Sequence, residues 1–276
     1  MKSPIRYYGG KGGMYKNILF HFPPFIYSDK KCCNNGDLPI YIEAYGGSAS
    51  LLFHKEKTPI EIYNDLEINV YNLFNVLSKK ESYEKFKELC DLSIYSRKLF
   101  DEYIISLRID ELNEIERAFR FYYVNRVAYN GVGGFSCIVN AVRRNMSKSI
   151  SDMLSSIDCL DKIHQRLSSV IIENKNAIEL IRKYDQKNVF FYLDPPYHHS
   201  KRTSARYDLD MNDEQQYELI ETLISLKNAK VLISGYSCEL YNKLEDNQWE
   251  RIDLTINTQT SKRVPKKKIE SLWKNY

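Results

Sequence analysis

The sequence predicts an α/β protein with a doubly wound, mostly parallel mixed sheet and an inserted, mainly helical subdomain. Short apolar or β-branched runs alternate with helical patterns in both outer parts of the chain, and this alternation is typical of parallel strands joined by helices. It is interrupted between residues 81 and 167, where the sequence is charged, aromatic and mainly helical. At 276 residues, the chain is long enough for one large domain that carries such an insertion.

Strands are expected where short apolar runs end in turn residues. These runs are residues 40–44, 60–64, 170–173, 189–193, 230–234 and 250–256, and the last segment, 267–276, is expected to form an edge strand. Helical patterns lie at residues 49–55, 69–78, 176–184 and 213–226, and Asn212 provides an N-cap for the last of them. We therefore expect residues 1–80 and 168–276 to build one sheet domain around the 81–167 insertion.

The composition indicates a soluble protein without a metal site. Hydrophobic residues at 43% and charged residues at 28% are ordinary for a globular domain, and a net charge of +4 permits a polyanionic partner without requiring one. The six cysteines form no C-x-x-C pair and no zinc-like group with the histidines, which indicates reduced thiols. Neither a long apolar run nor a signal-peptide pattern occurs, so we expect a cytoplasmic protein that binds no membrane.

The most informative motif follows the apolar run at residues 189–193. It is Asp194-Pro195-Pro196-Tyr197, and because each proline lacks a backbone N–H and has a fixed φ, a rigid turn must begin where the strand ends. A carboxylate, an unpaired carbonyl and an aromatic ring are thereby held at the carboxyl edge of a sheet, where open α/β sheets bind ligands. A capping aspartate in a stiffened turn is the alternative explanation.

A second motif, at residues 41–50, predicts a strand that runs through a turn of small residues into a helix. Small side chains let a ligand approach the backbone there, while the N–H groups of the helix point toward it. The next expected strand ends in Asn64-Asp65, and a carboxylate at this position is how dinucleotide-binding folds hold ribose hydroxyls. Together with Asp194, these features predict a nucleoside pocket beside a reactive carboxylate. For Asp65 alone, capping of a helix is the alternative.

Two further segments combine glycine with basic or amide residues. Residues 5–13, IRYYGGKGG, suit an anion nest but lack the full P-loop signature, which argues against a P-loop ATPase. Residues 122–134 contain Asn125-Arg126 and Asn130-Gly131, and Asn and Arg are the side chains best shaped for bidentate contacts with adenine and guanine. A flexible turn in the first segment and a polar helix cap in the second are the alternatives.

In this order, the motifs resemble those of the DNA adenine methyltransferases of the D12 class, over nearly the whole chain. Residues 6–11 are similar to the family's W-x-G-G-K, residues 43–49 to its E-P-F-x-G-x-G, residues 125–131 to its N-R-x-x-[FY]-N-G and residues 194–197 to its D-P-P-Y. Asn64-Asp65 matches the acidic motif of the second strand, and the ending E-S-L-W-K-N-Y is also typical.

The chain departs from the family pattern at three places. Tyr7 replaces the usual tryptophan, Ala44-Tyr45 replaces Pro-Phe, and Ala49 stands at the second glycine position of its motif. Each exchange keeps a small or an aromatic side chain, so we expect it to affect cofactor affinity rather than the reaction.

The resemblance implies a Rossmann-like methyltransferase fold, S-adenosylmethionine as the methyl donor and transfer to the N6 amine of adenine in double-stranded DNA. The Asp194 carboxylate and the Pro195 carbonyl would accept hydrogen bonds from the two N–H groups of the amine. Without such acceptors, the lone pair of the amine is delocalised into the ring. Tyr197 would stack on the base after it has been flipped out of the duplex. No metal takes part. The implied cofactor-binding residues are Tyr7, Lys11, Glu43, Tyr45, Gly47, Ser48, Asp65 and Asp194.

The resemblance also implies that the 81–167 insertion is the target-recognition domain. The implied DNA-binding residues are Arg6, Asn125, Arg126, Asn130, Lys201 and Arg202. For residues 125–134, an architectural role that holds the insertion against the catalytic domain is the alternative to base reading. The resemblance suits a bacterial or phage origin and a cognate restriction endonuclease as a partner, and it leaves the oligomeric state open.

Two other functions compete with this interpretation. A DNA cytosine-N4 methyltransferase needs the same carboxylate, carbonyl and ring, but such enzymes more often carry Ser-Pro-Pro at this turn. A catalytically inactive DNA-binding regulator of the same fold is the second competitor, and the intact Asp194–Tyr197 motif and Asp65 argue against it. We therefore predict a site-specific DNA adenine-N6 methyltransferase.

Overall fold

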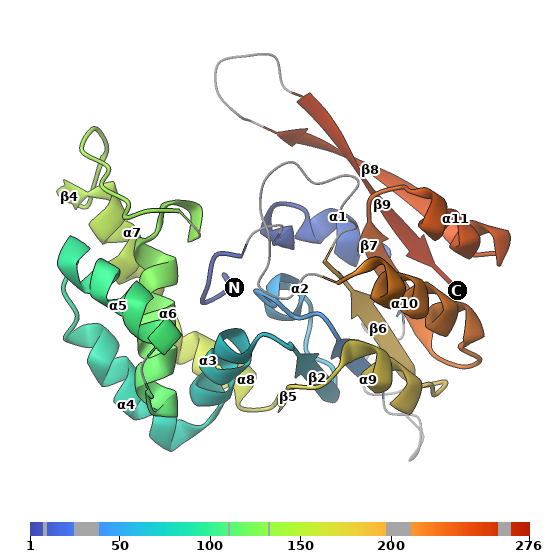
Figure 1. Ribbon diagram of the computed structural model, residues 1–276, viewed down its shortest axis with the longest axis horizontal. Helices are drawn as coiled ribbons and strands as arrows, with labels where there is room; N and C mark the ends of the chain where they lie inside the picture. The colour runs from blue at the N-terminus through green and yellow to red at the C-terminus, as the bar shows by residue number, and fades with distance from the viewer. Residues whose placement is uncertain (8–9, 25–38, 110, 132, 197–210, 259–265) are drawn as a thin grey trace. The chain divides into compact units, whose positions relative to one another are not determined.

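Strand β6 (Val189–Leu193) lies in the middle of the seven-stranded sheet formed by the described residues (Figure 1). The computed structural model describes residues 1–7, 10–24, 39–109, 111–131, 133–196, 211–258 and 266–276. The strand order is β5-β2-β1-β6-β7-β9-β8. The other strands are β1 (Ile40–Glu43), β2 (Ile60–Asn64), β5 (Ile171–Glu173), β7 (Lys230–Gly235), β8 (Glu250–Thr258) and β9 (Lys266–Lys274).

The sheet is mixed, as predicted. Strands β2, β1, β6 and β7 pair in parallel, whereas β9 pairs antiparallel with both β7 and β8. The helices are α1 (Tyr15–Leu19), α2 (Ser50–His54), α3 (Ile68–Ser78), α4 (Lys80–Asp91), α5 (Arg97–Ile109), α6 (Glu114–Val127), α7 (Lys148–Ile157), α8 (Leu160–Leu167), α9 (Ala177–Lys183), α10 (Asp213–Ser225) and α11 (Glu239–Asp246). The α/β architecture predicted from the alternating patterns is thus confirmed.

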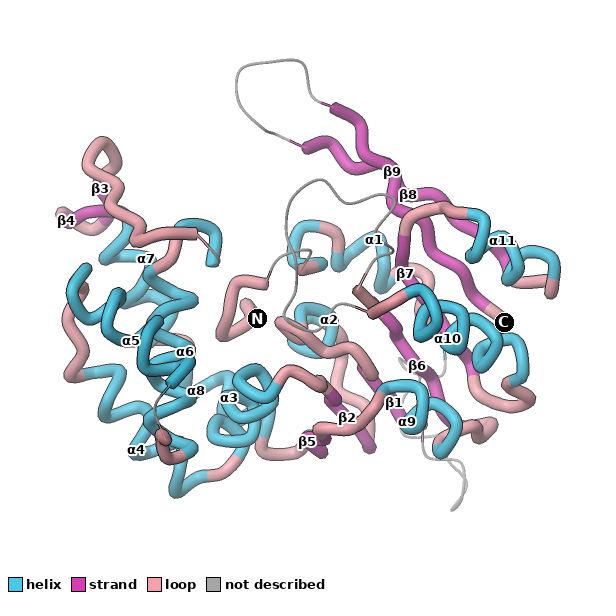
Figure 2. Tube along the Cα trace, viewed as in Figure 1, coloured by secondary structure: helices cyan, strands magenta, loops and turns pink. Residues whose placement is uncertain are grey.

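The chain divides into two compact units. The sheet unit comprises residues 16–46, 56–67 and 173–276, and the helical unit comprises residues 1–15, 47–55 and 68–172. The helical unit is therefore larger than the 81–167 insertion expected from the sequence, because it also contains the N-terminal segment and the turn that leads into α2. Figure 2 shows that helices dominate this unit, whereas the sheet unit contains both strands and helices.

Burial of both faces explains why β6 is a continuous apolar run. Phe191 belongs to one core together with Ile181 of α9 and Leu219 of α10. On the opposite face, the Phe190 ring packs against Phe22, with 4.7 Å between the ring centroids. All five β6 residues are buried, and a strand covered on both sides has no position at which a polar side chain reaches water.

The last strand corrects one expectation from the sequence. Residues 267–276 were expected to form an edge strand, but β9 lies between β7 and β8, and β8 forms the edge of the sheet. Leu272 and Trp273 are both fully buried, because β9 returns from β8 as its antiparallel partner and inserts beside β7. The edge expectation is therefore wrong.

The helical unit packs around α6. This helix contacts α3, α4, α5 and α7, and its Tyr122 and Tyr123 side chains are almost fully buried. Asn113 caps its N-terminus by accepting a hydrogen bond from the Glu116 N–H over 2.9 Å.

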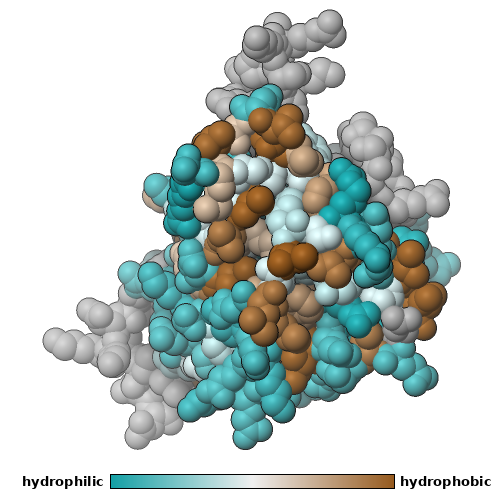
Figure 3. All heavy atoms as spheres, turned by 90° about the vertical axis from the view of Figure 1, so that its left-hand side faces the viewer, coloured by the Kyte–Doolittle hydropathy of each residue, from teal (hydrophilic) through white to brown (hydrophobic). Residues whose placement is uncertain are grey.

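The helical unit also exposes apolar side chains, among them Leu92, Ile94, Ile105 and Ile109. Figure 3 shows brown apolar atoms among teal hydrophilic ones on the left-hand face of Figure 1.

Asn64 joins the ends of two strands to the segment that follows β5. Its side-chain amide donates to the carbonyls of Ala44 (2.9 Å) and Lys175 (3.0 Å), and its Oδ1 atom accepts from the Lys175 N–H at 2.8 Å. Asn64 is fully buried, so no water can replace these partners. Although it belongs to the Asn64-Asp65 motif, its contacts are those of a structural residue.

We expect Asn64→Ala to lower the free energy of unfolding by about 2–4 kcal/mol, because three backbone groups lose their partner inside the protein. Chemical denaturation of both proteins measures this difference. As a control, Asn228→Ala removes exposed contacts with Asp185, among them a 3.4 Å hydrogen bond to its carbonyl, and should cost less than about 0.5 kcal/mol. Equal stabilities of the Asn64→Ala variant and the wild type would contradict the structural role.

Candidate active site

The carboxyl ends of the parallel strands meet at one edge of the sheet. Glu43 of β1 stands opposite Tyr63 of β2 and Tyr192 of β6, and Leu193 of β6 stands opposite Ile233 of β7. The residues at the end of these strands or directly after them therefore gather at the same edge, where open α/β sheets bind their ligands. They are Asn64-Asp65, Ala44-Tyr45 and Asp194.

The turn after β6 is held at two points. The Ser234 hydroxyl donates a hydrogen bond to Oδ1 of Asp194 over 3.0 Å, which fixes the carboxylate. The Gln216 side-chain amide donates to the carbonyl of Pro196 at 2.5 Å, which fixes the main chain. Asp194 is half-buried and Pro195 is buried. Tyr197, the last residue of the motif, lies outside the described residues.

Glu43 and Tyr45 belong to the same edge. Glu43 is buried, and the hydroxyl of Tyr41 donates to its Oε1 atom over 2.6 Å. Burial, and next the Glu43 carboxylate, raise the pKa of Tyr41 well above its ordinary value, so Tyr41 remains a donor at neutral pH. Burial also raises the pKa of Tyr45, whose ring packs against the apolar core. Glu43 and Tyr45 are thus held by a hydrogen bond and by core packing, respectively.

Asp65 follows β2 directly and is 9% exposed. Its Oδ1 atom accepts a hydrogen bond from the Glu67 N–H over 2.8 Å, and its carbonyl accepts from the Asn174 amide over 2.7 Å. The first bond belongs to the turn before α3, which begins at Ile68, and gives Asp65 a structural role in that turn. A carboxylate has about four acceptor sites, so this bond is also compatible with the predicted contact to ribose hydroxyls.

The other predicted cofactor residues, Tyr7, Lys11, Gly47 and Ser48, lie in the helical unit. Gly47 has a φ of 47°, and a Cβ atom there would lie 3.2 Å from the Tyr7 ring, so both conformation and space favour glycine. Lys11 is buried in the short 3-10 helix η1 (Lys11–Gly13). The N-terminal motif and the small-residue turn therefore meet within this unit, as the ring contact between Tyr7 and Gly47 shows.

Ala49 keeps a glycine-like backbone at the second glycine position of its motif. It precedes α2 with φ 52° and ψ 34°, in the left-handed region, and it is fully buried. This conformation costs a residue with a Cβ atom about 1–2 kcal/mol. Alanine thus adopts the backbone conformation that glycine would adopt at this position without strain.

Asn125 holds the backbone of Arg6. Its Oδ1 atom accepts from the Arg6 N–H and its amide donates to the Arg6 carbonyl, each over 2.7 Å. Asn125 is 6% exposed. Since both ends of the amide are occupied by the protein, these contacts favour the architectural alternative over base reading for Asn125.

Arg126, like Asn125, binds the backbone of the N-terminal segment. Its Nη2 atom donates to the carbonyl of Ser3 over 2.7 Å, and its guanidinium lies 5.8 Å from the centre of the Tyr122 ring. Burial lowers the pKa of Arg126 from its ordinary value. The guanidinium therefore secures the N-terminal segment to α6 inside the helical unit, which again favours architecture.

The remaining predicted DNA-binding residues differ in exposure. Asn130 is exposed and left-handed, with φ 54° in the η4 segment (Tyr129–Gly131). Gly131 follows with φ 84°, and a Cβ atom there would lie 2.8 Å from the Arg6 carbonyl oxygen. The Arg6 side chain is 37% exposed and lies 3.9 Å from Asp152. Lys201 and Arg202 lie outside the described residues.

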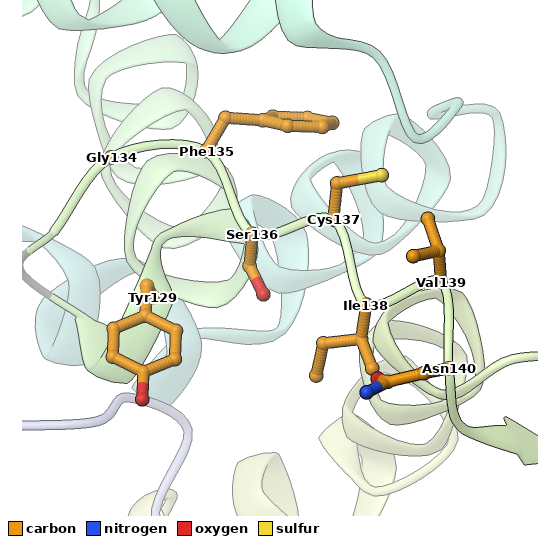
Figure 4. A pocket seen from close by; sticks show the side chains of 8 residues that line it. All are labelled: Tyr129, Gly134, Phe135, Ser136, Cys137, Ile138, Val139 and Asn140. Carbon is orange, nitrogen blue, oxygen red and sulfur yellow. The ribbon is translucent and has the colours of Figure 1, made fainter.

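Tyr129 was not singled out from the sequence as a candidate. Its side chain is 62% exposed, beside an open cavity of about 440 Å³ that is lined by Tyr129 and by residues 134–140. Figure 4 shows the rings and side chains that line it, with Tyr129 and Asn140 on opposite sides. The sequence signal that could have identified it is an aromatic residue directly before Asn-Gly, because an aromatic ring beside a turn can stack on bases.

A small hairpin was also missed. Strands β3 (Val142–Arg143) and β4 (Met146–Ser147) are joined by Arg144 and Asn145, both with positive φ, as a two-residue hairpin turn requires. Arg143 forms an ion pair with Asp152 over 3.0 Å. Burial raises the pKa of Asp152, but hydrogen bonds from Lys148 and Arg143 outweigh it and hold this pKa below its ordinary value. The asparagine in the R-R-N sequence is the only early signal of this turn.

Among the described residues, no group of three or more His, Cys, Asp or Glu side chains is arranged to hold a metal ion. In the same part of the chain, no helix is long and apolar enough to cross a membrane.

Acidic residues follow β2 and β6 of the mixed α/β sheet, at the edge where sheets of this class bind their ligands. The family model of D12 class N6 adenine-specific DNA methyltransferases matches residues 7–258, and the chain belongs to this family. The chain is 21% identical to the type II methyltransferase M.MjaIII of Methanocaldococcus jannaschii, over 88% of each chain. It is 22% identical to the type II methyltransferase M.CviBI of Paramecium bursaria Chlorella virus NC1A, over 91% of this chain and 90% of the relative.

A third relative, the type II methyltransferase M1.LlaDCHI of Lactococcus lactis, is 27% identical over 60% of this chain. The family match confirms the predicted family, reaction and enzyme class. The protein is an N6 adenine-specific DNA methyltransferase, and the family match does not favour the cytosine-N4 alternative or the inactive regulator.

We expect Asn125→Ala to destabilise the protein by about 2–3 kcal/mol, because the N–H and carbonyl of Arg6 both lose their partner. Chemical denaturation measures the loss, and Asn140→Ala, an exposed asparagine of the same unit, serves as the control. The folded variant should lose DNA affinity by the same factor on the recognition sequence of the enzyme and on single-base variants of that sequence. Wild-type stability together with a loss confined to one base pair would instead establish base reading.

Proposed function

We propose that this adenine-N6 methyltransferase uses S-adenosylmethionine and places the target amine against Asp194 and the carbonyl of Pro195. When bound, the cofactor supplies an electrophilic methyl group. The observation that carries the proposal is the position of Asp194, directly after the buried strand β6 and fixed by Ser234. A carboxylate held in this way can accept an N–H of the exocyclic amine without reorganising first.

The residues present suit a nucleoside with a methionyl tail. Asp65 places a carboxylate after β2, where ribose hydroxyls are held in related folds. Glu43, the Tyr45 ring and the Gly47-Ser48 turn supply acceptors, an aromatic face and backbone that a ligand can approach closely. Tyr7 and Lys11 complete the proposed set on the strength of the motif that they belong to.

The residues at the turn would act by positioning and electrostatics. The amine lone pair is delocalised into the adenine ring, and two acceptors at its N–H bonds favour a pyramidal nitrogen. The Asp194 carboxylate would accept a hydrogen bond from one N–H group of the amine, and the Pro195 carbonyl would accept one from the other. Tyr197 would stack on the base. Because a base paired in a duplex cannot reach such a turn, we propose that the adenine is flipped out of the helix.

The helical unit is the proposed DNA-binding part. Its exposed Tyr129 and Asn130 and its Arg143–Arg144 hairpin offer a stacking ring, an amide and guanidinium groups at the surface. A two-stranded ribbon fits the major groove, where base edges are distinguishable. Arg6, Lys201 and Arg202 are proposed phosphate contacts, whereas Asn125 and Arg126 are proposed to hold the N-terminal segment in place.

Two coarser proposals concern the cellular setting. The relatives are named type II methyltransferases, which supports a cognate restriction endonuclease as the companion of this enzyme. We also propose that the protein acts in the cytoplasm on double-stranded DNA.

Asp194→Ala should fold normally and lose methyl transfer by more than about 100-fold, because an acceptor for the amine is removed. Transfer of labelled methyl groups to DNA measures the rate, and thermal denaturation checks the fold. The matched control is Asp253→Ala, since Asp253 also accepts a hydrogen bond from a buried strand serine, Ser271, over 2.6 Å. Transfer by Asp194→Ala within about tenfold of wild type would refute the role of Asp194.

Asp65→Ala should weaken binding of S-adenosylmethionine by about 10- to 100-fold, as expected for a lost charged hydrogen bond to ribose. Calorimetry with the cofactor alone measures the dissociation constant. Asp65→Asn is the control, because its amide oxygen can still accept from the Glu67 N–H and preserve the turn. If Asp65→Ala lowers stability and leaves the dissociation constant unchanged, Asp65 is a capping residue only.

A further inference from the structure

Ser234 lies at the end of β7 next to the catalytic turn. Leu193 of β6 pairs with Ile233 of β7, so the following residues, Asp194 and Ser234, stand side by side. Ser234 is fully buried. Its Oγ atom lies 3.0 Å from Oδ1 of Asp194, 3.0 Å from the Tyr192 hydroxyl and 3.3 Å from the Leu193 carbonyl oxygen.

The distribution of hydrogens determines which of these contacts Ser234 donates. Serine has one hydroxyl hydrogen, and both the carboxylate and the Leu193 carbonyl can only accept. The carboxylate is the nearer acceptor, and a bond to a charged group is the stronger one. With this hydrogen directed to Asp194, the bond between the two hydroxyls must be donated by Tyr192. The contacts thus form a chain from Tyr192 through Ser234 to Asp194.

We propose that Ser234 is a positioning residue that sets the orientation of the Asp194 carboxylate for methyl transfer, with Tyr192 orienting Ser234. This inference rests on the proposed role of Asp194 as an acceptor for the amine. Ser234 contacts neither reacting group in this role and acts only through the carboxylate.

The main chain of the turn is fixed independently of Ser234. Gln216, fully buried on α10, donates to the carbonyl of Pro196, and Asn212 and Gln215 cap this helix reciprocally. The backbone of the turn is therefore anchored to a well-defined helix. The side-chain torsion that turns the carboxyl plane is broad for aspartate, and the hydroxyl of Ser234 restrains this torsion by its bond to Oδ1.

Removal of this restraint should affect the rate of the chemical step more than binding. A misplacement of reacting groups by about 1 Å can cost roughly 100-fold in rate. If Ser234 only filled space in the sheet, its loss would lower stability and leave the rate at saturating substrate unchanged. The two roles therefore predict different kinetic results.

The experiment compares Ser234→Ala with Ser271→Ala under single-turnover conditions at saturating cofactor and DNA. Ser271 is the matched control, because it is a buried serine of the neighbouring strand β9 that also donates to an aspartate, Asp253. Ser234→Ala should transfer methyl groups about 10- to 100-fold more slowly, with dissociation constants for S-adenosylmethionine and DNA within about twofold of wild type. Ser271→Ala should keep the wild-type rate.

Two further variants test the mechanism. Ser234→Thr retains the hydroxyl and should recover most of the rate, and Tyr192→Phe should show a smaller loss than Ser234→Ala. A wild-type rate for Ser234→Ala would overturn the proposal, as would an equal loss for Ser271→Ala. If Ser234→Thr fails to fold, Tyr192→Phe decides, and a wild-type rate for that variant counts against the hydroxyl chain.

Asp194→Ala is measured in parallel to separate the two inferences. Loss of transfer in Asp194→Ala together with a wild-type rate in Ser234→Ala removes only the positioning role. Retention of transfer in Asp194→Ala removes the proposed function of the turn, on which the positioning role depends.

Discussion

The double-sided burial of β6 is the constraint on which the catalytic turn depends. A strand packed on both faces and hydrogen-bonded on both edges resists a shift along its axis, because a shift by one residue would exchange its two faces and break the side-chain packing on each. The register with β1 and β7 is therefore fixed. The residue after Leu193 inherits this fixed position, and the two prolines end the strand at that point.

Support for the turn comes from neighbours that are distant in the sequence. Ser234 reaches Asp194 from β7, and Gln216 reaches Pro196 from α10. Both side chains are fully buried, so their bonds do not compete with water. A carboxylate in this setting requires little rearrangement when a substrate arrives, which is the physical meaning of preorganisation.

The sequence predicted most elements because their signals are local. The apolar runs of β1, β2, β6 and β7 and the N-cap at Asn212 each lie within a few residues of the element that they define. The position of β9 could not be predicted in this way, since an edge strand and an inner strand differ only in a partner that lies elsewhere in the chain. The same reason explains why Ser234 and Gln216 were missed and why the contact of Asn125 with the Arg6 backbone was not predicted. The chemistry of a side chain indicates what it can bind, but its actual partner is set by tertiary contacts.

The contact between Asn125 and Arg6 has a consequence for which substitutions this chain can tolerate. Asn125 binds the N–H and the carbonyl of residue 6, which every amino acid other than proline offers in the same geometry. The anchor is therefore indifferent to the side chain at position 6, and that side chain is free to change without loosening the N-terminal segment. Because Asn125 binds only the backbone of residue 6, substitutions of the half-exposed Arg6 side chain can change the surface charge there while the N-terminal segment stays in place.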